Sequence, residues 1–244
     1  MLDPRARRAL ERDALVAQLS GEERAPFIER SRRGGTLPSG MPGVLAAQQA
    51  WTRVTPVIEH LAPLLDHESC QTIAIETVLE GWRLHGLLEN VGSNGQVLWS
   101  VDALNPWVML RAWCAHLLLN TDSDAPSHET HLVDAVGVIR FPGQEDAVAT
   151  LGRLIELYRE GLCRPVAFFP RSAWDYVSAT KNPLAKAQRT WMGSEYASAA
   201  RESADPFFAL AFRDRLETAL DSEFESLAAQ VFGTPARLVK EARG

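Results

Sequence analysis

The stretch TIAIETVLEGWRLHGLLENVGSNGQVLWSV, residues 72–101, decides the fold class. Residues 72–79 are rich in β-branched side chains with a period of two, and two further β-prone runs at 81–91 and 96–101 flank the sequence GSNG at 92–95. Apolar runs of this kind, separated by Gly and Asn, are typical of strands joined by tight turns. The sequence therefore predicts a three-stranded meander.

Elements of both kinds follow the meander. We expect Asn105 to cap a largely buried helix at 107–119 that has proline in its first position. A fourth strand is expected at 132–141, a helix with one apolar face at 147–162, and a short buried strand at 164–169. Strands that alternate with helices indicate an α/β fold with flanking helices.

The remainder of the C-terminal half is expected to be helical. Ser172 follows a proline and is expected to cap a helix, with Asp175 in the position of the capping-box acid. Residues 184–243 have a helical pattern that Gly and Pro interrupt at a few points.

The first 66 residues are expected to form a helical extension. A helical pattern at 4–33 is followed by the Gly/Pro-rich hinge GGTLPSGMPG at 34–43, and the helical pattern returns at 44–65 with a kink at Pro56. We therefore divide the chain into this extension, residues 1–66, and an α/β domain with a helical C-terminal part, residues 67–244.

Composition limits the classes of function. The 244 residues are 46% hydrophobic, and they contain neither a long apolar run nor the apolar stretch of a signal peptide, so we expect a cytoplasmic protein without a membrane span. The net charge is −6, and residues 61–160 carry 14 acidic against 5 basic side chains. This balance argues against a protein that coats nucleic acid by charge alone, but a local basic patch stays possible. The three cysteines have no disulfide or zinc spacing and are expected to be buried thiols.

No common catalytic motif is present. The sequence has no Walker loop, dinucleotide fingerprint or nucleophile elbow. His128 and His131 could hold a metal only if they were helical, and the surrounding residues have loop composition. His85 and Glu89 share a strand face, where a hydrogen-bonded polar pair is a simpler interpretation than proton transfer. We therefore expect no metal and no cofactor.

Several short motifs, in a fixed order from about residue 30 to near residue 233, resemble the C-terminal region of RecC, the gamma subunit of exodeoxyribonuclease V. They are LPSG at 37–40, GWRLHG at 81–86, NPW at 105–107, YREG at 158–161, RP at 164–165, FFPRSAW at 168–174 and ESADPFF at 202–208.

The resemblance implies a restriction-endonuclease-like (PD-(D/E)xK) mixed sheet flanked by helices, with a degenerate nuclease site. An active relative would carry Gly-x-Ile-Asp on one strand and Asp-x-Lys on the next, because the acids hold Mg²⁺ and the lysine assists the attacking water. Here the first motif ends in Glu89, Ser100 stands where the second acid belongs, and Asp102 stands where the lysine belongs. This implies that the chain has no catalytic residue of its own. The alternative is an active metal-dependent nuclease with displaced acids.

The resemblance also implies partners: RecB-like and RecD-like motor subunits, and a double-stranded DNA end or fork that the complex holds and splits. No motif identifies the DNA contacts. The candidates are the basic residues that follow the acidic region near Trp174 and Trp191, namely Arg164, Arg171, Lys181, Lys186, Arg189 and Arg201. The competing interpretation is a solvated face with internal ion pairs.

Six aromatic residues lie between residues 191 and 224 in the C-terminal helical part: Trp191, Tyr196, Phe207, Phe208, Phe212 and Phe224. Because aromatic side chains are enriched at interface centres, we expect a partner interface at Trp191, Phe207, Phe208 and Phe212. Ordinary core packing is the alternative. A pure protein-interaction module without DNA contact is also compatible with the acidic charge.

Overall fold

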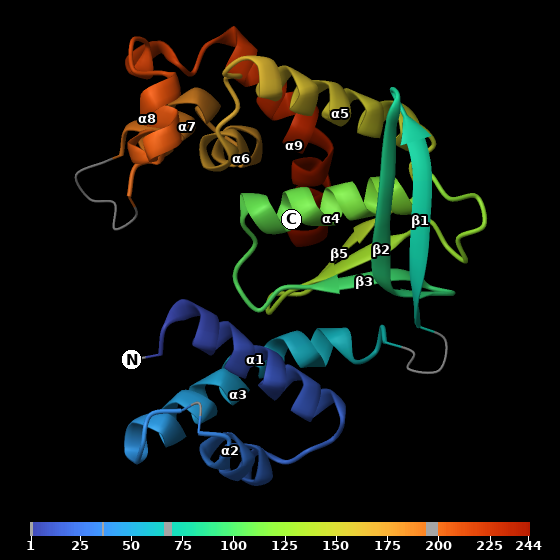
Figure 1. Ribbon diagram of the computed structural model, residues 1–244, viewed down its shortest axis with the longest axis vertical. Coiled ribbons are helices and arrows are strands. Elements are labelled where there is room, and N and C mark those ends of the chain that lie inside the picture. Colours follow the sequence, from blue (N-terminus) through green and yellow to red (C-terminus); the bar gives the residue numbers. More distant parts are fainter. Residues whose placement is uncertain (1, 36, 66–69, 194–199) are drawn as a thin grey trace.

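A five-stranded mixed sheet lies at the centre of the molecule (Figure 1). The computed structural model describes residues 2–35, 37–65, 70–193 and 200–244. Neighbouring strands are antiparallel except for the third and fourth, which are parallel. The order of neighbouring strands in the sheet is the same as their order in the chain: β1 (Gln71–Leu79), β2 (Trp82–Gly92), β3 (Gly95–Trp99), β4 (Thr130–Val133) and β5 (Val138–Phe141). The α/β class and the meander are confirmed.

Parallel neighbours need a crossover connection, and α4 (Pro106–Leu119) supplies it between β3 and β4. Asn105 caps this helix as predicted, since its side-chain oxygen accepts the N–H groups of Trp107 and Val108 at 3.1 and 3.2 Å. A local capping signal therefore sets where the crossover begins.

Two predicted strands are wrong. Residues 132–141 are not one strand, because the Asp134 carboxylate accepts the N–H groups of Val136 and Gly137 at 2.9 and 3.1 Å and forms the turn between β4 and β5. Residues 164–169 form no strand, and their apolar side chains enter the core of the C-terminal helices. A short apolar run alone does not distinguish a strand from a buried connection.

Three helices cover one face of the sheet: α1 (Pro4–Leu19), α2 (Arg24–Arg33) and α3 (Met41–Leu61). They form the N-terminal layer. Its apolar core includes Val97 and Val133 from the sheet. The last helix begins inside the predicted hinge at 34–43 and continues through Pro56.

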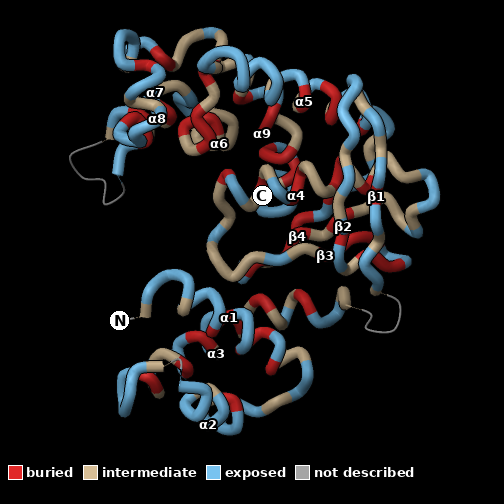
Figure 2. Tube along the Cα trace, in the orientation of Figure 1, coloured by how far each residue is buried: buried red, intermediate tan, exposed pale blue. Residues whose placement is uncertain are grey.

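The other face of the sheet carries α4, and α5 (Ala147–Cys163) and α9 (Ser222–Arg243) pack against that helix. The largest buried cluster lies here and includes Trp113, Phe141 and Phe232 (Figure 2). Among the helices of the described ranges, none is long and apolar enough to cross a membrane.

The C-terminal helices pack beyond this layer, on the side away from the N-terminal layer (Figure 1). They are α6 (Pro170–Ser178), α7 (Pro183–Met192) and α8 (Pro206–Ala211), with 3₁₀ turns at Glu202–Ala204 and Leu216–Thr218. The cysteines are free as predicted, but Cys163 is exposed and the other two are half-buried.

The predicted cap of α6 is wrong. Ser172 is the third helical residue, so its side chain is not at the N-cap. The Glu202 carboxylate caps the helix instead: it accepts the N–H of Arg171 at 2.8 Å and both the N–H and the hydroxyl of Ser172 at 2.7 Å. Asp175, the expected capping-box acid, binds Thr190 and Lys186 of α7.

Candidate nuclease remnant and interaction surfaces

The residues at the three candidate nuclease positions differ in exposure and in their place in the sheet. Glu89 is exposed on β2, whereas Ser100 and Asp102 follow the end of β3 and are half-buried. The Ser100 hydroxyl donates to the main-chain oxygen of Asp102 at 2.9 Å. In the described part of the chain, no group of three or more His, Cys, Asp or Glu side chains is placed to hold a metal ion.

Asp102 has a structural partner. Its carboxylate accepts from Arg53 of α3 at 2.6 Å, and the same guanidinium lies 3.2 Å from the carboxylate of Glu11 on α1. The Glu11 side chain is only 5% exposed. The acid at the degenerate position therefore joins the sheet to the N-terminal layer.

The two histidines that were considered as metal ligands are engaged elsewhere. Nε2 of His128 lies 3.0 Å from the main-chain oxygen of Asp122, and Nε2 of His131 lies 3.0 Å from that of Asn94. The second ring nitrogen of each histidine keeps a lone pair, but the described residues place no group of three or more His, Cys, Asp or Glu side chains around either ring. His85 and Glu89 are both exposed on β2, as the alternation predicts.

The six candidate DNA-binding residues lie between the C-terminal end of α5 and the 3₁₀ turn at Glu202–Ala204. Three of them have partners within the chain. Arg164 is ion-paired with Glu160 and with Glu223 at 2.6 Å, contacts that raise its pKa further, and Lys186 lies 3.1 Å from Asp175. Arg171 donates to the main-chain oxygen of Ala200 at 2.9 Å.

The other three candidates, Lys181, Arg189 and Arg201, are exposed, and none of them has an ion pair with another described residue. They are the cations of this region that are most available to a phosphate. DNA contact by any of the six stays a prediction.

The expected interface aromatics lie in different environments. Trp191 is 1% exposed: its ring is 4.0 Å from that of Phe169, and its Nε1 donates to the main-chain oxygen of Leu216 at 2.7 Å. Phe212 is also buried, Phe208 is half-buried, and Phe207 is 81% exposed. Phe207 is therefore the aromatic most available to a partner. Tyr196 lies outside the described residues.

The two tryptophans near the basic candidates, Trp174 and Trp191, pack against other side chains of the chain. The Trp174 ring contacts the Phe232 ring edge-on at 5.5 Å, and Trp191 lies in the core. A buried ring face cannot stack on a base, so this structure favours the core interpretation for Trp191.

Two polar residues in the core escape the sequence analysis. No local sequence signal indicates that Glu202 caps a helix, because the residues it binds are 30 and 31 positions away. His116 is fully buried on α4, with Nδ1 3.0 Å from the Thr130 hydroxyl and its ring stacked on Trp113. Burial disfavours the charged ring and lowers the pKa of His116 to about 4. This histidine is therefore neutral near pH 7.

The fold and these contacts define a helix-flanked α/β domain in which an acid after a central strand anchors a separate helical layer. The chain belongs to the family described as RecC C-terminal domain, whose sequence pattern matches residues 1–181. The matched range contains the five strands and the helices α1 to α6. It ends before α7, so it also leaves out α9.

The chain is also similar to a protein of Escherichia coli (strain K12) named RecBCD enzyme subunit RecC. The two are 28% identical over 168 residues, which cover 66% of this chain and 14% of that protein. The chain therefore corresponds to a limited part of this relative's length.

Proposed function

We propose that the chain is a non-catalytic domain of a RecC-like gamma subunit of a cytoplasmic exodeoxyribonuclease V. In this role it scaffolds RecB-like and RecD-like motor subunits and helps to hold and split duplex DNA during double-strand break repair. Family membership supports the proposal, together with the name of the relative. A helix-flanked mixed sheet is also the architecture that a restriction-endonuclease-like fold requires.

One observation carries the non-catalytic part of the proposal: the ion pair between Asp102 and Arg53. A carboxylate that is neutralised by a guanidinium is a poor ligand for Mg²⁺, which needs free oxygens in an octahedral arrangement. Glu89 then remains as an isolated exposed acid on β2. Of the residues at the candidate nuclease positions, Asp102 serves the attachment of the N-terminal layer.

The nuclease alternative is tested by incubating the purified chain with linear DNA and Mg²⁺. We expect no degradation. Metal-dependent degradation that disappears in Glu89→Gln would show that the chain is an active nuclease with displaced acids.

DNA contact is tested by measuring the affinity for a forked duplex over a range of salt concentrations. We expect Lys181→Ala/Arg189→Ala to weaken binding and to reduce the slope of log affinity against log salt by about 2, because each lost phosphate contact removes about 0.9. Arg5→Ala/Arg24→Ala is the matched control, since it removes two exposed cations from the N-terminal layer. Equal effects of the two pairs would show that Lys181 and Arg189 are not the contacts, and a wild-type affinity independent of salt would favour a module that does not bind DNA.

A further inference from the structure

A groove lies between the tip of the β1–β2 hairpin and the first turns of α5. Its volume is about 480 Å³. It is lined by Leu79 and Glu80 from the hairpin, and by Glu145, Asp146, Val148, Ala149, Gly152, Arg153 and Glu156 from α5 and the loop before it. The groove is separate from the basic candidates and from the degenerate nuclease positions.

Part of the lining of the groove is apolar: Val148 and Ala149 are exposed there, whereas Gly152 is buried. Leu79, Val148, Ala149 and Gly152 contribute apolar atoms, and Val148 is 51% exposed. Next to the groove, Val78 on the outer side of the hairpin is also largely exposed. An apolar surface of this kind favours contact with another apolar side chain.

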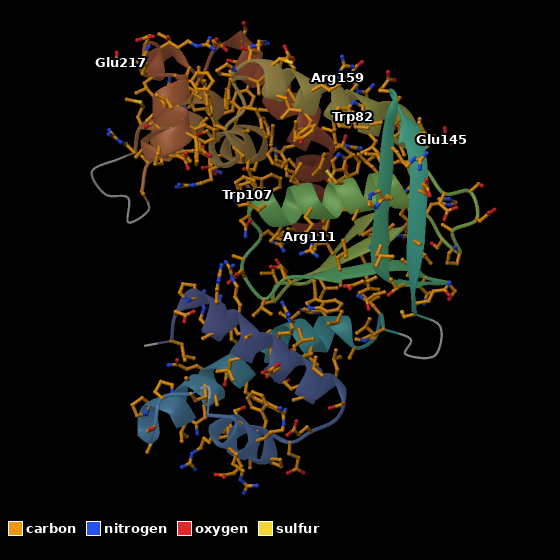
Figure 3. The ribbon with its side chains drawn as sticks, viewed as in Figure 1. Trp82, Trp107, Arg111, Glu145, Arg159 and Glu217 are labelled. Atoms are coloured by element: carbon orange, nitrogen blue, oxygen red, sulfur yellow. The ribbon has the colours of Figure 1, made fainter. Side chains whose placement is uncertain are left out.

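The rim of the groove is acidic. The lining includes four carboxylates and one guanidinium, and that guanidinium, of Arg153, lies 3.8 Å from Asp146. Glu80, Glu145 and Glu156 have no ion pair with any other residue that the structure describes. Figure 3 shows Glu145 beside the hairpin. Three carboxylates are thus available to a cationic partner.

The turn at the hairpin tip places one of these acids, Glu80, next to α5. Glu80 and Gly81 form a two-residue turn with φ angles of 50° and 77°. Glycine adopts such angles freely, but a glutamate in the left-handed region is strained, and Asn, Asp or Gly would satisfy this turn better. Gly152 of α5 lies directly beneath this acid: a Cβ there would be in ordinary van der Waals contact with Glu80, 3.8 Å from both its Cγ and its Oε1.

From these observations we propose that the groove is a docking site for a basic polypeptide segment of a protein partner, one that carries an apolar anchor between Lys or Arg residues. The stems of Lys and Arg are apolar and would cover Val148 and Ala149, while their charged ends would reach the carboxylates of the rim. Nucleic acid is a poor occupant because the unpaired carboxylates repel phosphate. The proposal does not depend on DNA contact elsewhere on the chain.

The binding test uses a dye-labelled amphipathic peptide of leucine and lysine, with the matched leucine and glutamate peptide as the comparison. Fluorescence anisotropy of the full chain should show binding of the basic peptide only. We expect Glu145→Gln/Glu156→Gln to weaken this binding by about fivefold, the effect of losing two exposed ion pairs. The control Glu23→Gln/Glu59→Gln removes two exposed acids from the N-terminal layer and should leave the affinity unchanged.

A second variant tests the shape of the groove. Gly152 is buried, so Gly152→Leu displaces the Glu80 side chain above it, and peptide binding should be reduced. A thermal melt that matches the wild-type chain shows that the fold is kept. Hydrogen exchange of the wild-type complex should show protection at residues 79–82 and 145–156.

Three results would overturn the proposal. One is equal weakening by the two double variants, which would show attraction to the net charge of the whole chain. The second is equal binding of the acidic peptide, and the third is protection confined to other residues. Forked-duplex affinity measured on the same variants should not change, so failure of this proposal is distinguishable from failure of the proposed DNA contact.

Discussion

The N-terminal layer and the C-terminal helices are held to the molecule by different contacts. The N-terminal layer meets the sheet through small apolar side chains such as Val97 and Val133, and through the Arg53 ion pairs. The C-terminal helices are held by a cluster of packed aromatic rings, with Phe169 in contact with Trp191, Phe208, Phe212 and Phe224. The comparison shows that a high aromatic content in a flanking segment can serve the core of that segment itself.

The largest effect should come from the aromatic core. Trp191→Ala removes a buried ring from the contact with Phe169, and we expect a loss of about 3–5 kcal/mol in the free energy of unfolding. Phe207→Ala removes an exposed ring and should change it by less than about 0.5 kcal/mol. Denaturant unfolding of both variants checks this. A near-neutral Trp191→Ala variant that loses partner binding would restore the interface interpretation of Trp191.

Acid should destabilise the core between α4 and the sheet, where His116 is buried, before the N-terminal layer. The pKa of His116 is about 4 in the fold against 6.5 as its ordinary value, so the unfolded chain binds the proton first as the pH falls. Stability from this group is complete above pH 6.5 and decreases toward pH 4, by up to about 3 kcal/mol. His116→Gln should flatten that pH dependence in unfolding experiments. Hydrogen exchange that accelerates first in α1–α3 would contradict the expected order.

The Glu202 cap should contribute less to the free energy of unfolding than the buried Trp191 ring does. Glu202→Ala leaves two N–H groups of α6 and the Ser172 hydroxyl without their acceptor, and we expect a loss of about 2 kcal/mol. Ser172→Ala removes the hydroxyl alone and should cost about 1 kcal/mol. Thermal melts of the two variants measure the difference. A larger loss for Ser172→Ala than for Glu202→Ala would show that the serine acts by another contact.

The smallest effect should come from the polar attachment of the N-terminal layer. Arg53→Ala leaves Glu11 and Asp102 without their shared cation, and we expect a loss of about 1 kcal/mol together with faster hydrogen exchange in α1–α3. Arg32→Ala is the matched control, because its ion pair with Glu29 is exposed on both sides. If the control accelerates exchange equally, the Arg53 contacts do not hold the layer.

Local sequence signals were enough to predict the elements whose contacts lie within a few residues of one another. The meander at 72–101 is set by alternating β-prone residues and Gly turns, and the start of α4 is set by Asn105 and the proline after it. Each of these depends on contacts within a few residues, so the sequence alone determined them. The turn at Asp134 also depends on local contacts, but the apolar residues on both sides of it predict one continuous strand.

The roles of the candidate site residues depended on contacts that are remote in sequence. Arg53 reaches Asp102 across 49 residues, and Glu202 reaches Ser172 across 30. An acid or an aromatic ring has the same identity in a site, a core or an interface, and only its neighbours and its exposure separate these roles. The sequence by itself determined the α/β class and the family resemblance. Only the tertiary structure decided that Asp102 anchors a helical layer and that Trp191 is core, because burial and ion pairing arise when distant segments pack together.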